Sequence, residues 1–550
     1  LAVVRTGEDQ PSPSAFRAAI RDVIRHCIYG VDLNPLAVEL CKVALWLEAH
    51  NPNEPLNFLD HHIKCGNAIV GLAHFKELQN GIANEAFKTL PADAKDIAAT
   101  FRNKNKVERK TKGQLGIYDL TDANESLDKI RNKFSEFMDM PEDKPEEIAA
   151  KAEAYKKLTK GKGWYRLKQL ADLQVAQFFI PKTIENKELL TTDAKYRTYL
   201  NSGAQIQDRG AAIAKAAEKH FFHWFLEFPE VFNQGGFDCI LGNPPFLGGQ
   251  KITGTYGNDF AEFIRQNYAP IGSVDLVTYL FRRIFEIIKE GGFQSLISTN
   301  TIAQGSAREG GLEIITEKNG VINHAVRSMR WPGLAAVEVS LVTIFKGVWT
   351  SSFTLNSKIV NQINSYLDDE IFIGNPFKLS QNENLSFQGS IPLGMGFVLD
   401  KDEAKKIINQ DSKYNEVIFD YLNGSDLNNQ PDLKATRSII NFFDWSEDKA
   451  KDYPICYEIL YNKVKPERQR WKKDKNGNEL VGVYKLREPM PTKWWIYCEK
   501  RPTLYKTISG LDNCLVVART SKTVGFALVN TTQVLNANLT IIANSDYQHF

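Results

Sequence analysis

Short apolar runs alternate with stretches of helical periodicity along the first part of the chain. The run at residues 27–31 (CIYGV) ends at Asp32 and is followed by helical spacing from Pro35, and the run from Phe237 to Leu241 ends at Gly242. Short buried strands that end at a turn and lead into a helix are typical of α/β domains. The pattern therefore predicts an α/β fold with strands that end near Asp32 and Gly242.

The same pattern predicts how the chain is divided. A stretch rich in Ala, Lys and Glu at helical spacing separates two α/β parts, and later the composition shifts toward Asn, Ser, Asp and aromatic residues in short strand-like runs. The predicted parts are an α/β domain over 1–75 and 237–350, a helical insertion over 76–236, and an α+β domain over 351–550.

Helical spacing predicts three helices in the α/β part. They cover Ser14 to Arg25, a stretch that begins at Pro35, and Ser273 to a Gly-Gly stop at Gly292. In the second of these helices six residues are expected to face inward: Ala37, Leu40, Cys41, Ala44, Leu45 and Leu47.

Two polar stretches are expected at the surface. The basic run from Asn103 to Lys112 is typical of a solvated loop, and His61 and His62 are expected as polar surface or strand-start residues, because no carboxylate or Cys pair accompanies them at metal-ligand spacing. The glycine-containing stretch from Leu247 to Gly257 is expected as a loop that orders on DNA, with Lys251 meeting phosphate.

Composition excludes several classes of protein. Lys and Arg number 68 against 66 for Asp and Glu, so net charge decides nothing about nucleic acid. Seven scattered cysteines without a CxxC pair predict reduced thiols in the cytoplasm and no structural metal. No apolar run approaches the ~20 residues of a membrane span.

The tetrad Asn243-Pro244-Pro245-Phe246 follows the strand that ends at Gly242. Ligands bind at the carboxyl ends of strands in open α/β sheets, and two prolines make a rigid turn without N–H donors. The Asn243 side-chain oxygen and the Pro244 carbonyl can each accept one hydrogen from a planar exocyclic amine, and Phe246 can stack on its ring. A proline-rich turn without chemistry is the alternative.

Two more strand ends carry polar side chains. Asp32 precedes a helix where nucleotide-binding folds hold ribose hydroxyls, although a helix-capping role is an equal alternative, and Asn67 follows a short strand at His62 to Cys65.

Three segments in this order resemble motifs II, III and IV of the gamma-type adenine DNA methyltransferases, especially the large methylases of type IIG restriction-modification systems and of phage-defence systems such as DISARM. The segments are IYGVDLNPLAVELCKVALWLE (Ile28 to Glu48), IKCGNAIVG (Ile63 to Gly71) and FDCILGNPPFLGG (Phe237 to Gly249).

The resemblance implies a doubly wound Rossmann-like sheet and transfer of methyl from S-adenosylmethionine to the N6 amine of a flipped adenine in double-stranded DNA. It implies cofactor contacts from Asp32, Asn67 and Asp275, the last in a motif V region. The family commonly has an acidic residue where this chain has Asn67. The glycine-rich motif I is expected before Leu1.

Basic and aromatic residues interleave from Tyr461 to Lys506, a mixture that suits DNA phosphates and bases. YLNGSDLN (Tyr421 to Asn428) and VKPER (Val464 to Arg468) resemble the target-recognition domain of the same family. The expected DNA contacts are Arg470, Trp471, Lys472, Lys473 and Lys475. A charged face over an ordinary core is the alternative.

Other functions stay open at this point. One is a non-catalytic DNA-binding specificity module, and another is an amino-group methyltransferase that acts on RNA guanine or protein glutamine. Other restriction or defence subunits are candidate partners, but no nuclease core of the PD…ExK type is recognisable in the sequence.

Overall fold

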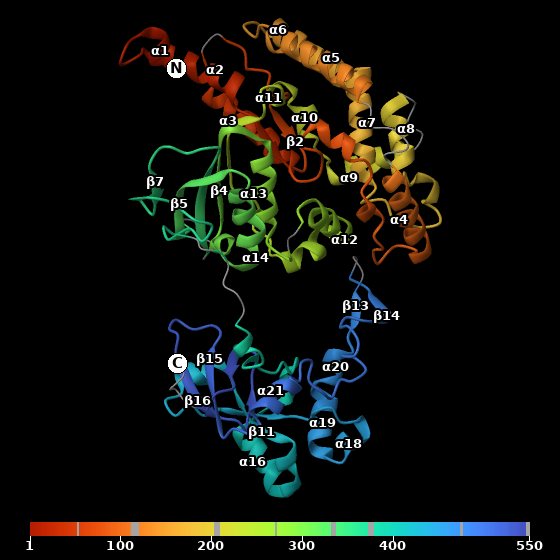
Figure 1. The fold of residues 1–550 in the computed structure, drawn as a ribbon, viewed down its shortest axis with the longest axis vertical. Coiled ribbons are helices and arrows are strands. Elements are labelled where there is room, and N and C mark those ends of the chain that lie inside the picture. Colours follow the sequence, from red (N-terminus) through yellow and green to blue (C-terminus); the bar gives the residue numbers. More distant parts are fainter. Residues whose placement is uncertain are drawn as a thin grey trace. The chain divides into compact units, whose positions relative to one another are not determined.

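The computed structural model describes residues 1–550 except 52–53, 112–119, 203–208, 270–271, 332–336, 372–373, 375–378, 474–476 and 546–550. The chain forms two compact units, Leu1–Ile373 and Gly374–Phe550 (Figure 1). Both are mixed α/β.

A six-stranded mixed sheet organises the first unit. In order across the sheet its strands are β3 (Phe237–Gly242), β4 (Ile288–Thr299), β6 (Glu338–Lys346), β5 (Gly320–Arg330), β7 (Phe353–Leu355) and β8 (Lys358–Val360). β3 and β4 run parallel, whereas β6 is antiparallel to both β4 and β5. The domain boundary predicted near residue 350 is wrong, because β7 and β8 extend this sheet beyond it.

Two parallel strands, β1 (Gly30–Asp32) and β2 (Ile63–Cys65), form a separate small sheet in the same unit. The helices around them are α1 (Ala2–Thr6), α2 (Pro13–Cys27) and α3 (Pro35–Glu48). The predicted helix from Pro35 is therefore confirmed, whereas the strand predicted at residues 27–31 forms at Gly30–Asp32, because α2 continues through Cys27.

The predicted inward face of α3 is largely wrong. Leu40 is 60% and Leu47 74% exposed, and Cys41 and Ala44 are exposed as well. α3 instead packs with Val38 and Lys42, whose ammonium pairs with Asp60 at 2.7 Å. A helix that is apolar around most of its circumference gives no periodic signal for the side that packs.

Helix α13 (Leu276–Ile287) covers one face of the six-stranded sheet (Figure 1). Its side chains Val277, Phe281 and Phe285 are spaced by one turn and pack in one core with Leu296 of β4. The predicted glycine stop at 291–292 is wrong, because the helix ends at Ile287 and β4 has already begun. Gly291 adopts a φ of 79°, so these glycines serve an irregular stretch of strand and not a helix end.

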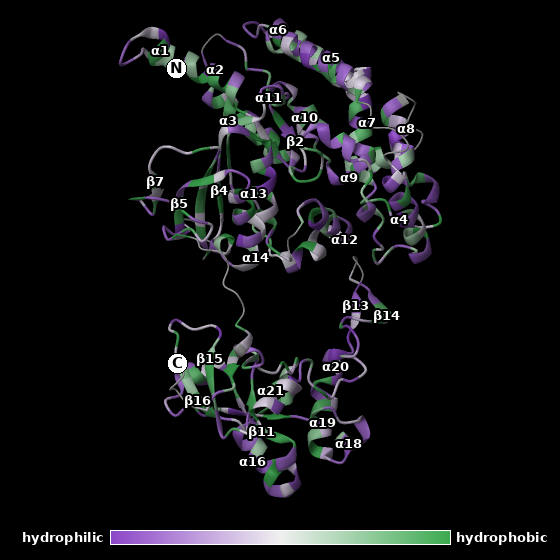
Figure 2. Ribbon diagram, in the orientation of Figure 1, coloured by the Kyte–Doolittle hydropathy of each residue, from purple (hydrophilic) through white to green (hydrophobic). Residues whose placement is uncertain are grey.

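The predicted insertion consists of helices. Figure 2 shows two of them, α4 and α5, as more hydrophilic than strands β4 and β5 of the sheet. Its helices are α4 (Lys95–Lys110), α5 (Thr121–Met138), α6 (Pro145–Thr159), α7 (Lys162–Ala176), α8 (Asp193–Ser202), α9 (Arg209–Lys219), α10 (Trp224–Glu227) and α11 (Pro229–Asn233). α7 lies at their centre, and Leu167, Leu170 and Leu173 are completely or almost completely buried.

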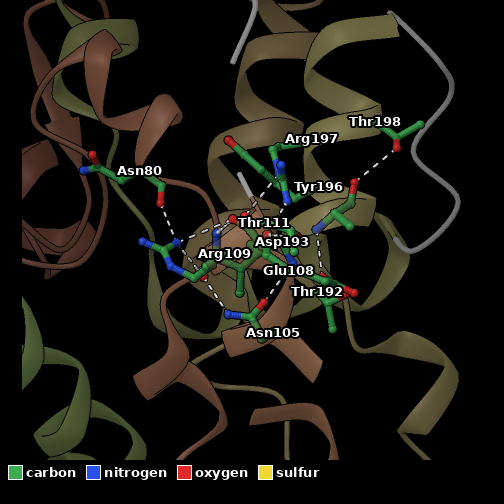
Figure 3. Close-up of polar contacts among 12 residues, drawn as sticks. Asn80, Asn105, Glu108, Arg109, Thr111, Thr192, Asp193, Tyr196, Arg197 and Thr198 are labelled. Carbon is green, nitrogen blue, oxygen red and sulfur yellow. Dashed lines mark hydrogen bonds and ion pairs between the residues drawn. The ribbon is translucent and has the colours of Figure 1, made fainter. Parts of the chain in front are cut away.

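Polar contacts fasten α4 to the start of α8 (Figure 3). The buried Asp193 carboxylate pairs with Arg197 at 3.2 Å and with Arg109 at 3.5 Å, and the Asp193 N–H donates to Asn105 Oδ1 at 2.8 Å. Glu108 accepts from the Ala194 N–H at 2.9 Å. The basic run predicted as a surface loop therefore belongs to α4 through residue 110, and Arg109 has a structural role; Lys112 lies outside the described residues.

His61 and His62 are fully buried, which corrects their predicted surface position. Their rings lie 4.0 Å apart between Tyr29, 3.9 Å from His62, and Phe58, 5.5 Å from His61. Burial lowers the pKa of His62 to about 3 and that of His61 well below its usual value. Both imidazoles are therefore neutral members of an aromatic core at pH 7.

The second unit contains two four-stranded sheets and a two-stranded ribbon. In order across the first sheet the strands are β10 (Val398–Asp400), β12 (Arg437–Ile440), β11 (Ile418–Leu422) and β17 (Val534–Leu535). In order across the second sheet they are β16 (Phe526–Asn530), β15 (Asn513–Ala518), β18 (Leu539–Ile542) and β9 (Ser386–Gln388). The ribbon pairs β13 (Trp471–Lys473) with β14 (Glu479–Tyr484). The helices are α16 (Lys401–Gln410), α17 (Gly424–Asn429), α18 (Glu447–Lys451), α19 (Pro454–Lys463), α20 (Lys465–Arg468) and α21 (Pro502–Ile508).

Candidate active site

The Asn243–Phe246 turn directly follows the carboxyl end of β3, as predicted. β3 pairs in parallel with β4, and Gly242 lies opposite Leu296. Asn243 is exposed, Pro244 is buried, and the Phe246 ring is 38% exposed. Among the described residues nothing hydrogen-bonds the Asn243 amide or donates to the Pro244 carbonyl. The Asn243 amide and the Phe246 ring are thus exposed at this sheet edge, beside a Pro244 carbonyl that has no donor among the described residues.

The stretch after the turn is not the loop that the sequence predicts. Helix α12 (Gly249–Asn267) begins there, with a kink at Gly257, where φ is 95°. The first turn of α12 holds Lys251, which is exposed and makes no side-chain hydrogen bond or ion pair with another described residue. Glycines lower helix propensity without forbidding a helix, and buried Ile252, Phe260 and Phe263 supply the packing that fixes it.

Close backbone packing holds the start of α12 against the segment before α13. The Leu276 N–H donates to the Leu247 carbonyl at 2.9 Å. A Cβ on Gly249 would lie 2.6 Å from the carbonyl carbon of Ser273, which is closer than any side chain tolerates. The residue at 249 must therefore be glycine for the turn to keep this position.

Gly249→Ala is expected to lower the free energy of unfolding by about 1–3 kcal/mol, because backbone must move to admit the methyl group. The matched control is Gly254→Ala in the same helix, where a Cβ would meet nothing within 4 Å; this change is expected to be neutral or to stabilise by up to about 1 kcal/mol. Thermal unfolding of both variants tests the contrast. Equal melting temperatures would contradict the close approach at Gly249.

Asp275 lies beside the same turn. A Cβ on Gly248 would be 3.4 Å from Asp275 Oδ1, and Asp275 Oδ2 accepts from the hydroxyls of Thr299 (3.3 Å) and Thr301 (3.4 Å). Asp275 precedes α13, and its side chain makes no capping hydrogen bond. Its carboxylate is therefore held at the end of β4, next to the segment that follows Phe246.

Thr299 and Thr301 are site residues that motif reasoning missed. Their hydroxyls lie 2.7 Å apart and both face the Asp275 carboxylate. The available signal was positional, because residues at the carboxyl ends of adjacent parallel strands share one edge of a sheet. β4 ends at Thr299 and its neighbour β3 ends at Gly242.

Asp32 is the last residue of β1, and Asn67 lies just after the end of its parallel partner β2. The Asn34 N–H donates to Asp32 Oδ1 at 2.7 Å, and Asn34, not Asp32, caps α3 by accepting from the Leu36 N–H at 3.0 Å. Asp32 is exposed, and its second oxygen has no partner among the described residues. Asn67 Oδ1 accepts from the Ile69 N–H at 3.2 Å, which leaves its amide NH₂ free within the described chain.

The two groups of candidates come from two separate sheets that pack together near the starts of β1 and β3. Tyr29, just before β1, packs its ring 5.6 Å from Phe237, the first residue of β3. No hydrogen bond in the described ranges joins Asp32 or Asn67 to the Asn243 turn or to Asp275. Among the described strands β1 pairs only with β2, and β3 pairs only with β4. β3 is therefore an edge strand, and its Leu241 is 76% exposed.

The predicted basic and aromatic stretch divides into a surface part and a core part. Arg470, Lys472 and Lys473 are exposed on or beside the β13–β14 ribbon, and Trp471 stacks on Tyr484 at 4.7 Å and 9°. Lys475 lies outside the described residues. The ribbon therefore presents cations around one ordered aromatic pair.

Several members of the stretch are structural, which corrects their predicted place on a surface. Arg468 is 1% exposed and donates to the carbonyls of Leu393 (3.2 Å), Trp494 (3.1 Å) and Ile496 (2.6 Å), among others. The side chains of Trp494, Trp495 and Tyr497 are buried in the core of the second unit. An alternation of cations and rings cannot distinguish these from surface residues.

Within the described ranges, no cluster of three or more His, Cys, Asp or Glu side chains is arranged to bind a metal ion. The helices described here also include none with the length and apolar character needed to cross a membrane.

The sequence matches the Eco57I restriction-modification methylase family over residues 26–323. A protein of Methanocaldococcus jannaschii, by its name a type II restriction enzyme and methyltransferase, is 23% identical over 235 residues, which cover 41% of this chain and 18% of that relative.

Two solved structures are similar at low scores. One is the type IIL restriction-modification enzyme MmeI in complex with DNA, with 16% identity, a TM-score of 0.43, and coverage of 61% of this chain and 47% of that chain. The other is a DrdV–DNA complex, with 11% identity, a TM-score of 0.26, and coverage of 70% of this chain and 45% of that chain. The family assignment therefore rests on the sequence match.

Proposed function

Because the chain belongs to the Eco57I restriction-modification methylase family, we propose that it transfers methyl from S-adenosylmethionine to the N6 amine of adenine in duplex DNA. The observation that carries this proposal is the exposed Asn243 amide in a rigid diproline turn at the carboxyl end of β3. The setting is restriction-modification or phage defence in the cytoplasm.

The turn suits a planar amine. Asn243 Oδ1 and the Pro244 carbonyl accept the two amine hydrogens, which draws the nitrogen lone pair out of conjugation with the base. Phe246 stacks on the ring. S-adenosylmethionine, when bound, supplies an electrophilic methyl group. The amine loses its proton after transfer, so the chain needs no strong base.

The target base must leave the helix, because its amine is otherwise held in the stack. Extrusion costs a few kcal/mol, which contacts with the protein must offset. The partly exposed Phe246 ring gives the extruded base an apolar surface beside the two acceptors.

The polar ends of β1 and β2 fit the cofactor. Asp32 keeps one carboxylate oxygen free for ribose hydroxyls, and the Asn67 amide is free to contact the adenine ring. Asp275 would contribute from the β4 side. In this proposal β1–β2 and β3–β4 are parts of one doubly wound sheet.

Asp32→Ala is expected to weaken S-adenosylmethionine binding by on the order of 1–3 kcal/mol, because a charged hydrogen-bond acceptor is lost. Calorimetry on the intact natural protein measures this affinity. Asn34→Ala is the matched control: it removes the cap of α3 and lowers stability without changing cofactor affinity. Unchanged affinity in Asp32→Ala would show that Asp32 does not contact the cofactor and serves only to accept the hydrogen bond from the Asn34 N–H.

The second unit is proposed as the target-recognition domain. Its β13–β14 ribbon offers Arg470, Lys472 and Lys473 to phosphates, and Lys251 of the first unit offers another cation near the catalytic turn. Lys475 is proposed as a further contact.

Acceptor competition tests the proposal. The intact natural protein is incubated with methyl-labelled cofactor and equal masses of duplex DNA, structured RNA and a glutamine-rich peptide. Label in DNA alone is expected. Label in RNA or peptide would instead support an amino-group methyltransferase that acts on RNA or on protein glutamine. Stable DNA binding without any label would support a non-catalytic specificity module.

A further inference from the structure

A cavity of about 150 Å³ lies in the first unit, between the helical insertion and the far half of α12. Phe178, Phe179 and Ile180 form one wall, Leu90 and Pro91 another, and Asn258 and Asp259 a third. The kink at Gly257 brings this last pair to the cavity. Nothing in the proposed methyl transfer uses this site.

Lys182 lines the cavity and is only 1% exposed. No hydrogen bond or ion pair in the described part of the chain engages its ammonium group. A charged group that is largely removed from water and has no acceptor in the protein favours the binding of an acceptor in the cavity. Burial lowers the pKa of Lys182 to about 8, although Asp93 and Asp259 oppose the shift.

The walls around Lys182 are fixed in advance. Asp93 accepts from the Lys182 N–H and from the Leu90 N–H, both at 2.8 Å. Asp259 accepts from the Phe260 N–H at 2.9 Å and pairs with Lys219 at 3.0 Å. Both carboxylates are anchored, yet each oxygen retains a lone pair for a further donor.

The charges of the cavity indicate a neutral ligand. Lys182, Asp93 and Asp259 line the cavity, and Lys219, which is not part of the lining, pairs with both Asp259 and Glu218, so an added carboxylate would increase the excess of negative charge. A neutral amide offers a carbonyl to the ammonium and an N–H to a carboxylate. A cavity of this volume with apolar walls accepts one ring the size of benzene.

We propose that this cavity binds a single six-membered ring that carries an amide group. The amide carbonyl accepts from Lys182, and the amide N–H donates to Asp93 or Asp259. The ring packs against Phe178, Phe179 and Leu90.

Calorimetric titration of the full chain with benzamide tests this site. Saturable binding with one site is expected, and Lys182→Met is expected to weaken it about tenfold or more, because a hydrogen bond to a charged group is lost. The matched control is Lys187→Met, an exposed lysine nearby, which should bind like the parent. Ala92→Phe at the exposed rim should fill the cavity and abolish binding without touching Lys182.

Three results would overturn the proposal. They are the absence of saturable benzamide binding by the parent chain, tighter binding of benzoate than of benzamide, and unchanged binding in both Lys182→Met and Ala92→Phe. If Lys182→Met fails to fold, the result with Ala92→Phe decides alone.

Discussion

Asn243→Ala is expected to abolish methyl transfer and to leave DNA affinity within a few fold of the parent. Asn243 is exposed just after β3 and its side chain makes no hydrogen bond with other described residues, so its loss should not disturb the fold. It removes one of only two acceptors for the target amine. Most DNA affinity comes from phosphate contacts elsewhere, which the substitution leaves in place.

The measurement is methyl incorporation into duplex DNA alongside a binding titration at fixed salt, both with the intact natural protein. Asn243→Asp is the conservative control, because it retains an acceptor oxygen in the same place, and it should retain measurable transfer. Undiminished methylation by Asn243→Ala would remove the turn from the catalytic site. A loss of DNA affinity equal to the loss of activity would point to damaged DNA binding instead.

Neutralising Lys472, Lys473 and Lys475 together is expected to flatten the salt dependence of DNA affinity. Each lost phosphate contact reduces the slope of log K against log salt by about 0.9 for duplex DNA. Lys472 and Lys473 are exposed on the ribbon, where Glu479 lies across from Lys473, and no ion pair engages either ammonium group within the described residues, so both cations are available to phosphates. The preferred site should remain the same, because phosphate contacts position a protein and base contacts specify the sequence.

Affinity is measured over a range of salt concentrations for the parent, the triple glutamine variant and a control. The control is Lys405→Gln with Lys406→Gln, two exposed lysines on α16 of the same unit. An unchanged slope in the triple variant would show that these lysines do not contact DNA phosphates. An equal slope change per charge in the control would assign the effect to general electrostatics.

The sequence predicted local elements wherever pattern and turn chemistry agreed. β3 and its diproline turn, β1 with Asp32 at its end, and α2 were all predictable, because apolar runs and turn residues mark them without reference to the rest of the fold. The resemblance to restriction-modification methylases is confirmed by the family match over residues 26–323. The roles of individual site residues remain predictions.

The sequence failed where tertiary packing overrides residue type. His61 and His62 looked polar but lie in an aromatic core, and Arg468 looked like a DNA contact but holds backbone carbonyls together. Their burial depends on partners distant in the sequence, such as Tyr29 and Ile496. No local pattern contains that information.

Glycines produced the second kind of error. Gly291 and Gly292 were expected to stop a helix, but they lie inside β4. The glycines of α12 were expected in a loop, but they lie in a helix. Glycine permits several backbone conformations, so its presence alone selects none of them. Gly249 is required by its close approach to Ser273, and Gly257 by its φ of 95°.

Identification of the methylated nucleoside tests the central proposal most directly. Duplex DNA is incubated with the intact natural protein and S-adenosylmethionine that carries a deuterated methyl group, and the DNA is then digested to nucleosides for mass spectrometry. The account predicts deuterated N6-methyladenine, absent with Asn243→Ala. Deuterium in a methylcytosine, or in no nucleoside of the DNA, would contradict it.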